Sequence, residues 1–242
     1  MAGHSKWHNI KRRKAAVDAV RGREFAKVSR QIYVAVRNGG ADPKQNLALR
    51  AAMERAREIN MPADTIERTI KKALGDVEGA RYEEILYEGY APGGVAVLVQ
   101  ALTDNRNRTA QTVRHLFHKH GGSLGESGSA SYLFRYTGVV QIPRSPQTEQ
   151  AVLRALDLGA WEVEEDEEVV HLYVEPDALE EVRRTLESEG IEVRASRLTY
   201  VPTLTVRVEG ETAERVLALL EALDEEDEVQ EVYANAEWED VG

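Results

Sequence analysis

The sequence predicts an α+β fold with an N-terminal three-helix bundle and two ferredoxin-like α/β domains, one inserted into the other. Apolar residues recur at helical spacing over residues 22–75, and strand patterns with glycine-rich turns begin at Tyr82. Residues 135–202 follow the order βαββαβ, which is typical of a ferredoxin-like fold. The expected parts are a basic N-terminal arm at 1–21, a helical domain at 22–78, a discontinuous α/β domain at 79–134 and 203–242, and an inserted acidic domain at 135–202.

Three short helices are expected in the helical domain. The first should end at Asn38-Gly39-Gly40, a common stop signal. We expect the second to begin at Asp42-Pro43, with the aspartate as N-cap and the proline in the first helical position. Met61-Pro62 should separate it from a third helix that ends at Gly75.

The pattern changes in the discontinuous domain. ILYEGYAPGGVAVLVQALT predicts two strands joined by a turn, and DNRNRTAQTVRHLFHKHGG predicts a helix. The segment GGSLGESGSAS that follows reads as a flexible loop. After the inserted domain, TLTVRV, a helix through Leu219 and VQEVYANAEW supply strand, helix and strand. Their expected partner is the earlier ββα segment, and this makes the domain discontinuous.

Composition narrows the class of protein. The chain has 242 residues, of which 42% are hydrophobic and 30% charged, as expected of a folded protein. Neither a membrane-spanning run nor the apolar segment of a secretory signal is seen, and a mitochondrial presequence is the lesser interpretation of the basic start. Without cysteine there is no disulfide, thiolate zinc site or cysteine nucleophile. We therefore expect a cytoplasmic protein.

Charge is distributed very unevenly along the chain. The formal net charge is −11, yet residues 1–37 hold ten Lys and Arg residues and two acids. Residues 1–80 carry +8, residues 81–142 carry +1 and residues 143–242 carry −20. This segregation indicates a polyanionic partner for the basic end.

The basic arm is the first candidate nucleic-acid site. Its cations can neutralise phosphates, and Trp7 can stack on an unpaired base. A solvated basic tail is the alternative, and the interleaved aromatic and histidine residues favour binding over it. The candidate residues are His4, Ser5, Lys6, Trp7, Lys11, Arg12, Arg13, Lys14, Arg21 and Arg23.

The second candidate is the helix start TDNRNRT at 103–109, where Asn105, Arg106, Asn107 and Arg108 stand together. Free N–H groups and the positive end of the helix dipole suit a phosphate. An ordinary N-cap by Asp104 or Asn105 explains the segment equally well. Because cations oppose the dipole in a first turn, we expect replacement of both arginines to leave stability unchanged or slightly raised.

Catalytic and metal sites are weighed and set aside. Ser127 suggests a G-x-S-x-G nucleophile elbow, but Ser129 replaces the second glycine and the loop follows a helix instead of a strand. A hydrolase would need a base near Ser127, and the neighbouring histidines are the local candidates. His115, His118 and His120 lack a ligand set at familiar spacing, so no metal is expected. No cofactor and no enzymatic activity are expected either.

The acidic run at 162–170 reads as a solvated strand edge that resists aggregation.

The sequence resembles the YebC/PmpR family, which includes the mitochondrial translational activator of cytochrome oxidase subunit one. The resemblance covers essentially the whole chain. It rests on MAGHSKWHNIKRRK at 1–14, NMPADTIERTIKKA at 60–73, YEGYAPGGVAVLV at 87–99, and TDNRNRT…HGGSLGESGSASYLF at 103–134. The resemblance implies three domains, one helical and two α/β. It also implies either a DNA-binding transcriptional regulator or a translation factor that assists the ribosome at proline-rich stretches, and it transfers no catalytic residues.

The expected function is that of a non-enzymatic regulator of gene expression that binds nucleic acid. DNA and ribosomal RNA are both candidate partners, the ribosome is the competing assembly, no membrane is expected, and a monomer is favoured. Two points favour RNA: Trp7 suits unpaired bases, and the sequence offers no helix with a cluster of base-reading Arg, Asn or Gln. A protein adaptor that uses the acidic domain is a further alternative, and it predicts no salt-sensitive binding of nucleic acid.

Overall fold

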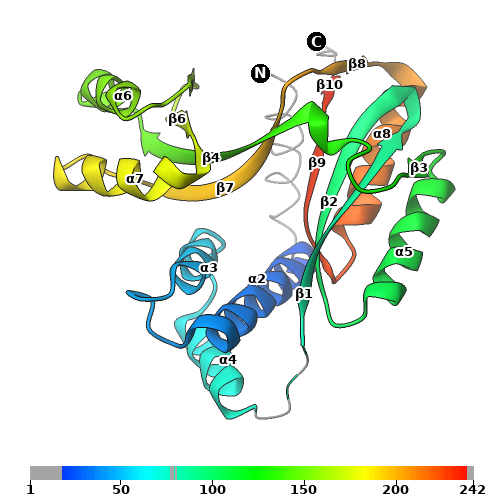
Figure 1. The fold of residues 1–242 in the computed structure, drawn as a ribbon, viewed down its shortest axis with the longest axis horizontal. Helices are drawn as coiled ribbons and strands as arrows, with labels where there is room; N and C mark the ends of the chain where they lie inside the picture. Colours follow the sequence, from blue (N-terminus) through cyan, green and yellow to red (C-terminus); the bar gives the residue numbers. More distant parts are fainter. Residues whose placement is uncertain (1–17, 77–78, 80, 239–242) are drawn as a thin grey trace. The chain divides into compact units, whose positions relative to one another are not determined.

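The structure, a computed structural model, describes residues 18–76, 79 and 81–238 (Figure 1). Helices and antiparallel sheets confirm the α+β class. The chain divides into two compact units. The smaller is Arg135–Val201, and the larger comprises the described residues of Ala2–Phe134 and Pro202–Gly242.

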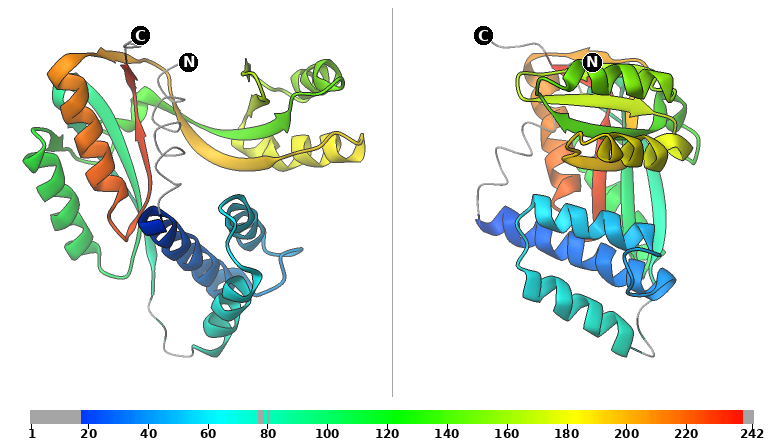
Figure 2. Two further views of the ribbon diagram at one scale, coloured as in Figure 1. Left: turned by 180° about the vertical axis from the view of Figure 1, so that it is seen from behind. Right: turned by 90° about the vertical axis from the view of Figure 1, so that its left-hand side faces the viewer.

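The larger unit begins with a bundle of three helices, α2 (Asp18–Gly39), α3 (Leu47–Glu58) and α4 (Ala63–Gly75). In both views of Figure 2, α2 lies between the other two. Their apolar faces meet in a core that includes Ile32, Leu49 and Ala56, all fully buried. Burial of these stripes, more than helix propensity, stabilises helices of this length.

The second helix starts four residues later than predicted. Residues 43–45 form a turn, because the Asp42 carboxylate accepts from the Lys44 backbone N–H at 2.9 Å instead of capping a helix. Asn46 is the N-cap, and its side-chain oxygen accepts from Leu49 N at 3.0 Å. Its amide group also donates to Ala35 O at 2.7 Å and Gly40 O at 2.8 Å. Asn46 therefore both starts α3 and ties it to the end of α2.

A four-stranded antiparallel sheet forms the rest of the larger unit, in the order β3-β1-β2-β9. The strands are β1 (Glu83–Ala91), β2 (Val95–Thr103), β3 (Ser123–Leu124) and β9 (Val229–Ala234), and the short 3-10 helix η1 (Pro92–Gly94) joins β1 to β2. Helices α5 (Arg106–Lys119) and α8 (Gly210–Asp224) share one core with it. Val97 and Val99 of β2 pack there with Phe117 and Leu220, so α5 has one face fixed on the sheet.

The strand expected at TLTVRV forms but does not join this sheet. It is β8 (Val206–Val208), which pairs in parallel with β10 (Ala236–Trp238). The buried side chain of Asn235 accepts from Ala96 N at 2.7 Å, and its backbone oxygen accepts from Val206 N at 2.8 Å. This residue connects the two sheets. The fourth strand of the main sheet is β3, from the segment predicted as a loop.

The smaller unit has the strand order β5-β6-β4-β7 that the βαββαβ pattern predicts. Its elements are β4 (Phe134–Pro143), α6 (Thr148–Asp157), β5 (Glu162–Glu165), β6 (Val169–Val174), α7 (Leu179–Ser188) and β7 (Ala195–Pro202), with the 3-10 helix η3 (Pro176–Ala178) before α7. The 3-10 helix η2 (Ser131–Leu133), which precedes β4, belongs to the larger unit. The core includes Val140, Leu172 and Leu186, which are fully buried. The acidic run at 162–170 forms the edge strand β5 and its turn, as predicted. Among the described helices, none combines the length and apolar character needed to span a membrane.

Candidate nucleic-acid interface

The predicted residues of the arm fall mostly outside the described residues. His4, Ser5, Lys6, Trp7, Lys11, Arg12, Arg13 and Lys14 all precede Asp18, so their contact with nucleic acid stays a prediction. Arg21 and Arg23 belong to α2, which begins at Asp18 and therefore includes the end of the segment predicted as an arm.

The cations of α2 contact acids at the end of α8. Arg23 pairs with Glu225 at 3.3 Å. Lys27, which is 4% exposed, pairs with Asp224 Oδ1 at 3.3 Å and also donates to the Asp224 backbone oxygen. Arg30 donates to the Asp227 backbone oxygen. The helical bundle is thus joined to the α/β part of the same unit by charged contacts.

These contacts correct part of the interpretation of charge. The sequence places the bases of α2 and the acids of residues 224–228 about 200 positions apart, and it counts them in regions of opposite sign. In the folded chain they neutralise each other locally. The net charge of residues 1–80 therefore overstates the charge that this region can offer to a polyanion.

At the helix start 103–109, the capping interpretation holds for one residue. The Asn105 side chain accepts from Arg108 N at 3.1 Å, and Thr103 Oγ1 accepts from Asn105 N at 2.9 Å. Arg106 pairs with Glu83 at 3.5 Å, while the exposed Asn107 lies one residue further on. Arg108 pairs with Asp104 at 2.9 Å and also with Glu228.

Glu228 places a carboxylate at the start of α5. It accepts hydrogen bonds from Thr103 Oγ1 at 3.0 Å and from Thr109 Oγ1, in addition to Arg108. Burial raises the pKa of Glu228, but the bonds from Thr109, Arg108 and Thr103 lower it more, so its pKa lies below the usual carboxylate value. The protein thus supplies its own anion at this candidate phosphate site.

The prediction that both arginines can be replaced without loss of stability took account of the helix dipole but not of these ion pairs. The charge of Arg108 is balanced by two carboxylates of the same unit. Contact of Arg106, Asn107 or Arg108 with nucleic acid stays a prediction. Glu228 could not be found from sequence because no local pattern links it to a helix start about 120 residues earlier.

The outward face of α5 carries a stripe of polar side chains that the sequence analysis missed. Asn107, Gln111, Arg114 and His118 stand at positions i, i+4, i+7 and i+11, and all four are exposed. At 3.6 residues per turn, these positions lie in one row along the helix. The opposite face bears Thr109, Val113, Leu116 and Phe117, which are buried. The statement that no helix offers a cluster of base-reading residues is wrong, since the register of α5 gathers them.

A second exposed row lies beside this stripe and is cationic. Arg108, His115 and Lys119 follow one another at i, i+7 and i+11. The whole helix of 14 residues holds four Arg and Lys residues and no Asp or Glu. Within the described part of the chain, Arg114 and Lys119 have no acidic partner.

The histidines of this region do not form a metal site. Burial and the charge of Lys119 lower the pKa of His120, which favours its neutral form. Over residues 18–76, 79 and 81–238, no group of three or more potential ligands could hold a metal ion.

The segment GGSLGESGSAS is ordered by Glu88, which corrects the prediction of a flexible loop. The buried Glu88 carboxylate accepts from the backbone N–H groups of Gly128 and Ala130 at 2.8 Å and Ser131 at 2.7 Å. Burial raises the pKa of Glu88, but these hydrogen bonds lower it more. Its pKa therefore lies below the usual carboxylate value, and the side chain is ionised at neutral pH. Gly128 adopts φ 86°, a conformation that glycine reaches without strain.

Ser127 is exposed at the tip of this segment. No hydrogen bond joins its hydroxyl group to a base within the described residues. Two residues on, the backbone oxygen of Ser129 accepts from Tyr90 OH at 2.6 Å. The loop is therefore a fixed surface feature.

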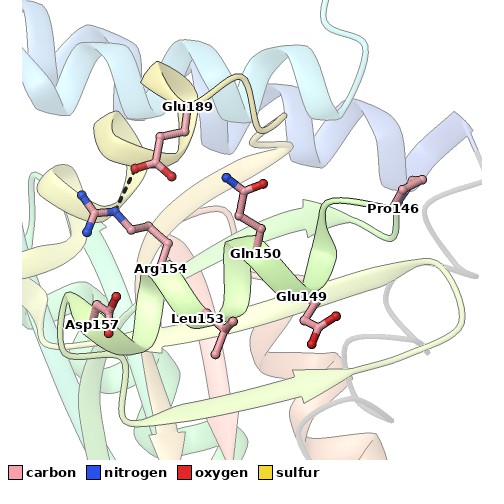
Figure 3. A pocket seen from close by; sticks show the side chains of 7 residues that line it. All are labelled: Pro146, Glu149, Gln150, Leu153, Arg154, Asp157 and Glu189. Atoms are coloured by element: carbon pink, nitrogen blue, oxygen red, sulfur yellow. Dashed lines mark hydrogen bonds and ion pairs between the residues drawn. The ribbon is translucent and has the colours of Figure 1, made fainter.

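The smaller unit contains a shallow hollow beside α6, shown in Figure 3. Its lining residues are Pro146, Glu149, Gln150, Leu153, Arg154, Asp157 and Glu189. Arg154, the one cation among them, is paired with Glu189 at 2.8 Å. This acidic lining disfavours a phosphate, and the hollow adds nothing to a nucleic-acid interface.

Comparison with known proteins places the chain in a family. Residues 5–76 match the model of the TACO1/YebC protein N-terminal domain, and residues 82–236 match that of the TACO1/YebC second and third domain. The chain belongs to the TACO1/YebC family. This confirms the resemblance inferred from the sequence motifs.

Relatives of similar length support the assignment. The chain is 50% identical to a "Probable transcriptional regulatory protein" of Persephonella marina, over 98% of this chain and 96% of the relative. It is also 50% identical to a protein of the same name from Thermotoga maritima, over 99% and 95%. A crystal structure of a conserved hypothetical protein from Aquifex aeolicus is similar, with a TM-score of 0.80 and 48% identity over 93% of this chain and 94% of that one. At family level, the names indicate a regulator of transcription.

Proposed function

We propose that this protein is a non-enzymatic regulator of gene expression that acts in the cytoplasm by binding DNA. The names of its relatives point to transcription. The observation that carries the proposal is α5, a helix with four Arg and Lys residues, two histidines and no acid. Its outward-facing charge is of the kind that binds a phosphate backbone.

The contrast with α2 supports this choice. Arg23 and Lys27 of α2 are paired with acids of residues 224–228. Arg114 and Lys119, in contrast, are exposed and lack an acidic partner among the described residues. A cation without an internal partner can release phosphate counterions on binding at little cost to the fold.

Binding should be tested with the full chain and duplex DNA of mixed sequence, by fluorescence anisotropy at several salt concentrations. Each phosphate contact adds about 0.9 to the slope of log K against log salt. We expect Lys119→Gln to reduce the steepness of that slope by about 0.9, the value for one phosphate contact. Arg194→Gln is the matched control, since Arg194 is exposed in the acidic smaller unit and has no side-chain partner among the described residues.

Two results would count against DNA as the ligand. A slope near zero for the unmodified chain would remove the electrostatic mechanism. Tighter binding to single-stranded or ribosomal RNA of the same length, at the same salt concentration, would favour the translation factor over the transcriptional regulator. Equal effects of the Lys119 and Arg194 variants would show that α5 is not the binding element.

A further inference from the structure

We infer that α5 is a reading helix, which lies in the major groove of duplex DNA and contacts base edges through Asn107, Gln111 and Arg114. This inference rests on the proposed function, but it assigns sequence readout to a particular face. The family models and the relatives' names place no such site.

The dimensions of the helix fit the groove. An α-helix with side chains is about 10–12 Å across, and the major groove is about 12 Å wide. From Asn107 to His118 the stripe covers eleven steps of about 1.5 Å, or roughly 16 Å. Since base pairs are stacked about 3.4 Å apart, this length reaches about five of them.

The chemistry of the stripe fits base edges. Asn and Gln can each form two hydrogen bonds with N6 and N7 of adenine, and Arg can do so with O6 and N7 of guanine. Asn107, Gln111 and Arg114 stand on successive turns of one exposed face. None of the three takes part in another hydrogen bond or ion pair through its side chain within the described residues, so all are available to a ligand.

The flanking row supplies contacts to the backbone. Lys119 and His115 lie beside the stripe and can approach phosphates on one wall of the groove. Arg215 of α8 adds a cation at the far end of α5, because its guanidinium group lies next to Gly121. At the near end, the carboxylates of Glu83 and Asp104 are paired with Arg106 and Arg108, which limits their repulsion of phosphates.

The same face is poorly suited to single strands. Proteins that bind unpaired bases stack them on exposed aromatic rings. Of the large aromatic side chains that stack bases best, α5 holds Phe117 alone, which is fully buried in the sheet core. The exposed face of α5 therefore offers hydrogen bonds and charge, with the imidazoles of His115 and His118 as its aromatic rings and no Trp, Tyr or Phe, and this favours a duplex.

The test is selection from a library of duplexes with a randomised centre, using the full chain, followed by affinity measurements on the enriched duplex and an unrelated one. We expect the unmodified protein to enrich a short motif. Asn107→Ala combined with Gln111→Ala should lower the preference for that motif by about tenfold or more, since each lost bidentate contact has that effect. Affinity for the unrelated duplex should stay within about twofold, because the charge is unchanged.

Arg114→Lys separates base reading from charge. Lysine keeps the positive charge but lacks the planar fork of arginine. We expect this variant to keep the salt slope and to lose preference at one base pair of the motif. For the double variant of Asn107 and Gln111, the control is Gln45→Ala combined with Gln150→Ala, because it also removes two exposed amides without a change in charge. Circular dichroism should show unchanged melting for all variants.

Two outcomes would overturn the inference. The first is binding to duplexes without enrichment of any motif, and the second is a motif that both α5 variants retain. In either case the proposed function would stand, with binding through phosphates alone. Absence of any duplex binding by the unmodified chain would instead remove the proposed function and, with it, this inference.

Discussion

Helices α2 and α5 are both cationic, but the fold uses their charges in opposite ways. In α2, Arg23, Lys27 and Arg30 contact residues 224–227 of the same unit. In α5, Arg114 and Lys119 face outward without an acidic partner among the described residues. The comparison shows that a basic segment identifies a binding surface only after its internal partners are known. In α2 the charges join two parts of one unit, and in α5 they remain available to a ligand.

The largest effect should come from the buried cation of α2. Lys27 is 4% exposed and pairs with Asp224, whose side chain is 19% exposed. Because Lys27→Met removes a buried cation from the carboxylate and backbone oxygen of Asp224, it should lower the free energy of unfolding by about 3 kcal/mol. Urea denaturation followed by circular dichroism would measure this.

The control for this prediction is an exposed pair of the same bundle. The side chains of Arg68 and Asp64 are 73% and 74% exposed. Arg68→Ala should therefore lower the free energy of unfolding by about 0.5 kcal/mol or less. If the two variants are equally stable, the pairing at Asp224 does not hold the bundle and the comparison between α2 and α5 loses its basis.

A smaller effect is expected at the acid that supports the start of α5. Glu228 accepts from Thr103, Thr109 and Arg108. Glu228→Gln replaces the charged acceptor of these hydrogen bonds with a neutral one. It should lower the free energy of unfolding by about 2 kcal/mol. Its pKa is lowered in the folded chain, so its contribution is present above the ordinary carboxylate pKa and is lost as pH falls through the lower, folded value.

Stability measured between about pH 6 and pH 2 would reveal this dependence. The difference between the unmodified chain and Glu228→Gln should be largest near neutral pH and should shrink on acidification. A difference that stays constant with pH would mean that the charge of Glu228 does not contribute, and that the variant acts through packing alone.

A still smaller effect is expected from Arg23 of α2 in the binding of DNA. Arg23 was predicted to contact nucleic acid, but Glu225 already pairs with it at 3.3 Å. We therefore expect Arg23→Gln to change the salt slope of DNA binding by much less than the value of about 0.9 for one phosphate contact. Anisotropy titrations of Arg23→Gln beside Lys119→Gln would compare the two helices directly. A larger loss for Arg23→Gln would reverse the roles that we assign to α2 and α5.

Local patterns in the sequence were enough for most of the fold. The βαββαβ order of residues 135–202 predicts the observed strand order, because this arrangement follows from element sequence alone. Asn46 was missed as the N-cap because Asp42-Pro43 is the stronger local signal, and the competing contacts to Ala35 and Gly40 form only in the folded bundle. Tertiary hydrogen bonds decided the start of α3.

The site depended more on contacts between distant residues. The basic and amide residues of 105–108 are visible as a motif, but Glu228 and its effect on Arg108 are not. Glu88 orders the segment 128–131 from about 40 residues away, so a glycine- and serine-rich composition misleadingly suggested flexibility. The stripe on α5 was within reach of the sequence, because DNRNRTAQTVRHLFHKHGG was predicted as a helix and the spacing of Asn107, Gln111 and Arg114 places them on one face.

The smallest expected effect concerns Arg106, the neighbour of Arg108. Its contact with Glu83 is 3.5 Å long, and the two side chains are 67% and 48% exposed. Such an ion pair adds a few tenths of a kcal/mol to the free energy of unfolding. A cation in the first turn of a helix lowers it by a similar amount, because the cation is repelled by the positive end of the helix dipole. Arg106→Gln should therefore leave the melting temperature nearly unchanged, whereas Arg108→Gln should lower it, because Arg108 bonds to Glu228. If the two arginines behave alike, Glu228 is not the anion that holds this end of α5. A loss of DNA affinity in Arg106→Gln without a change in melting would extend the binding face to the start of the helix.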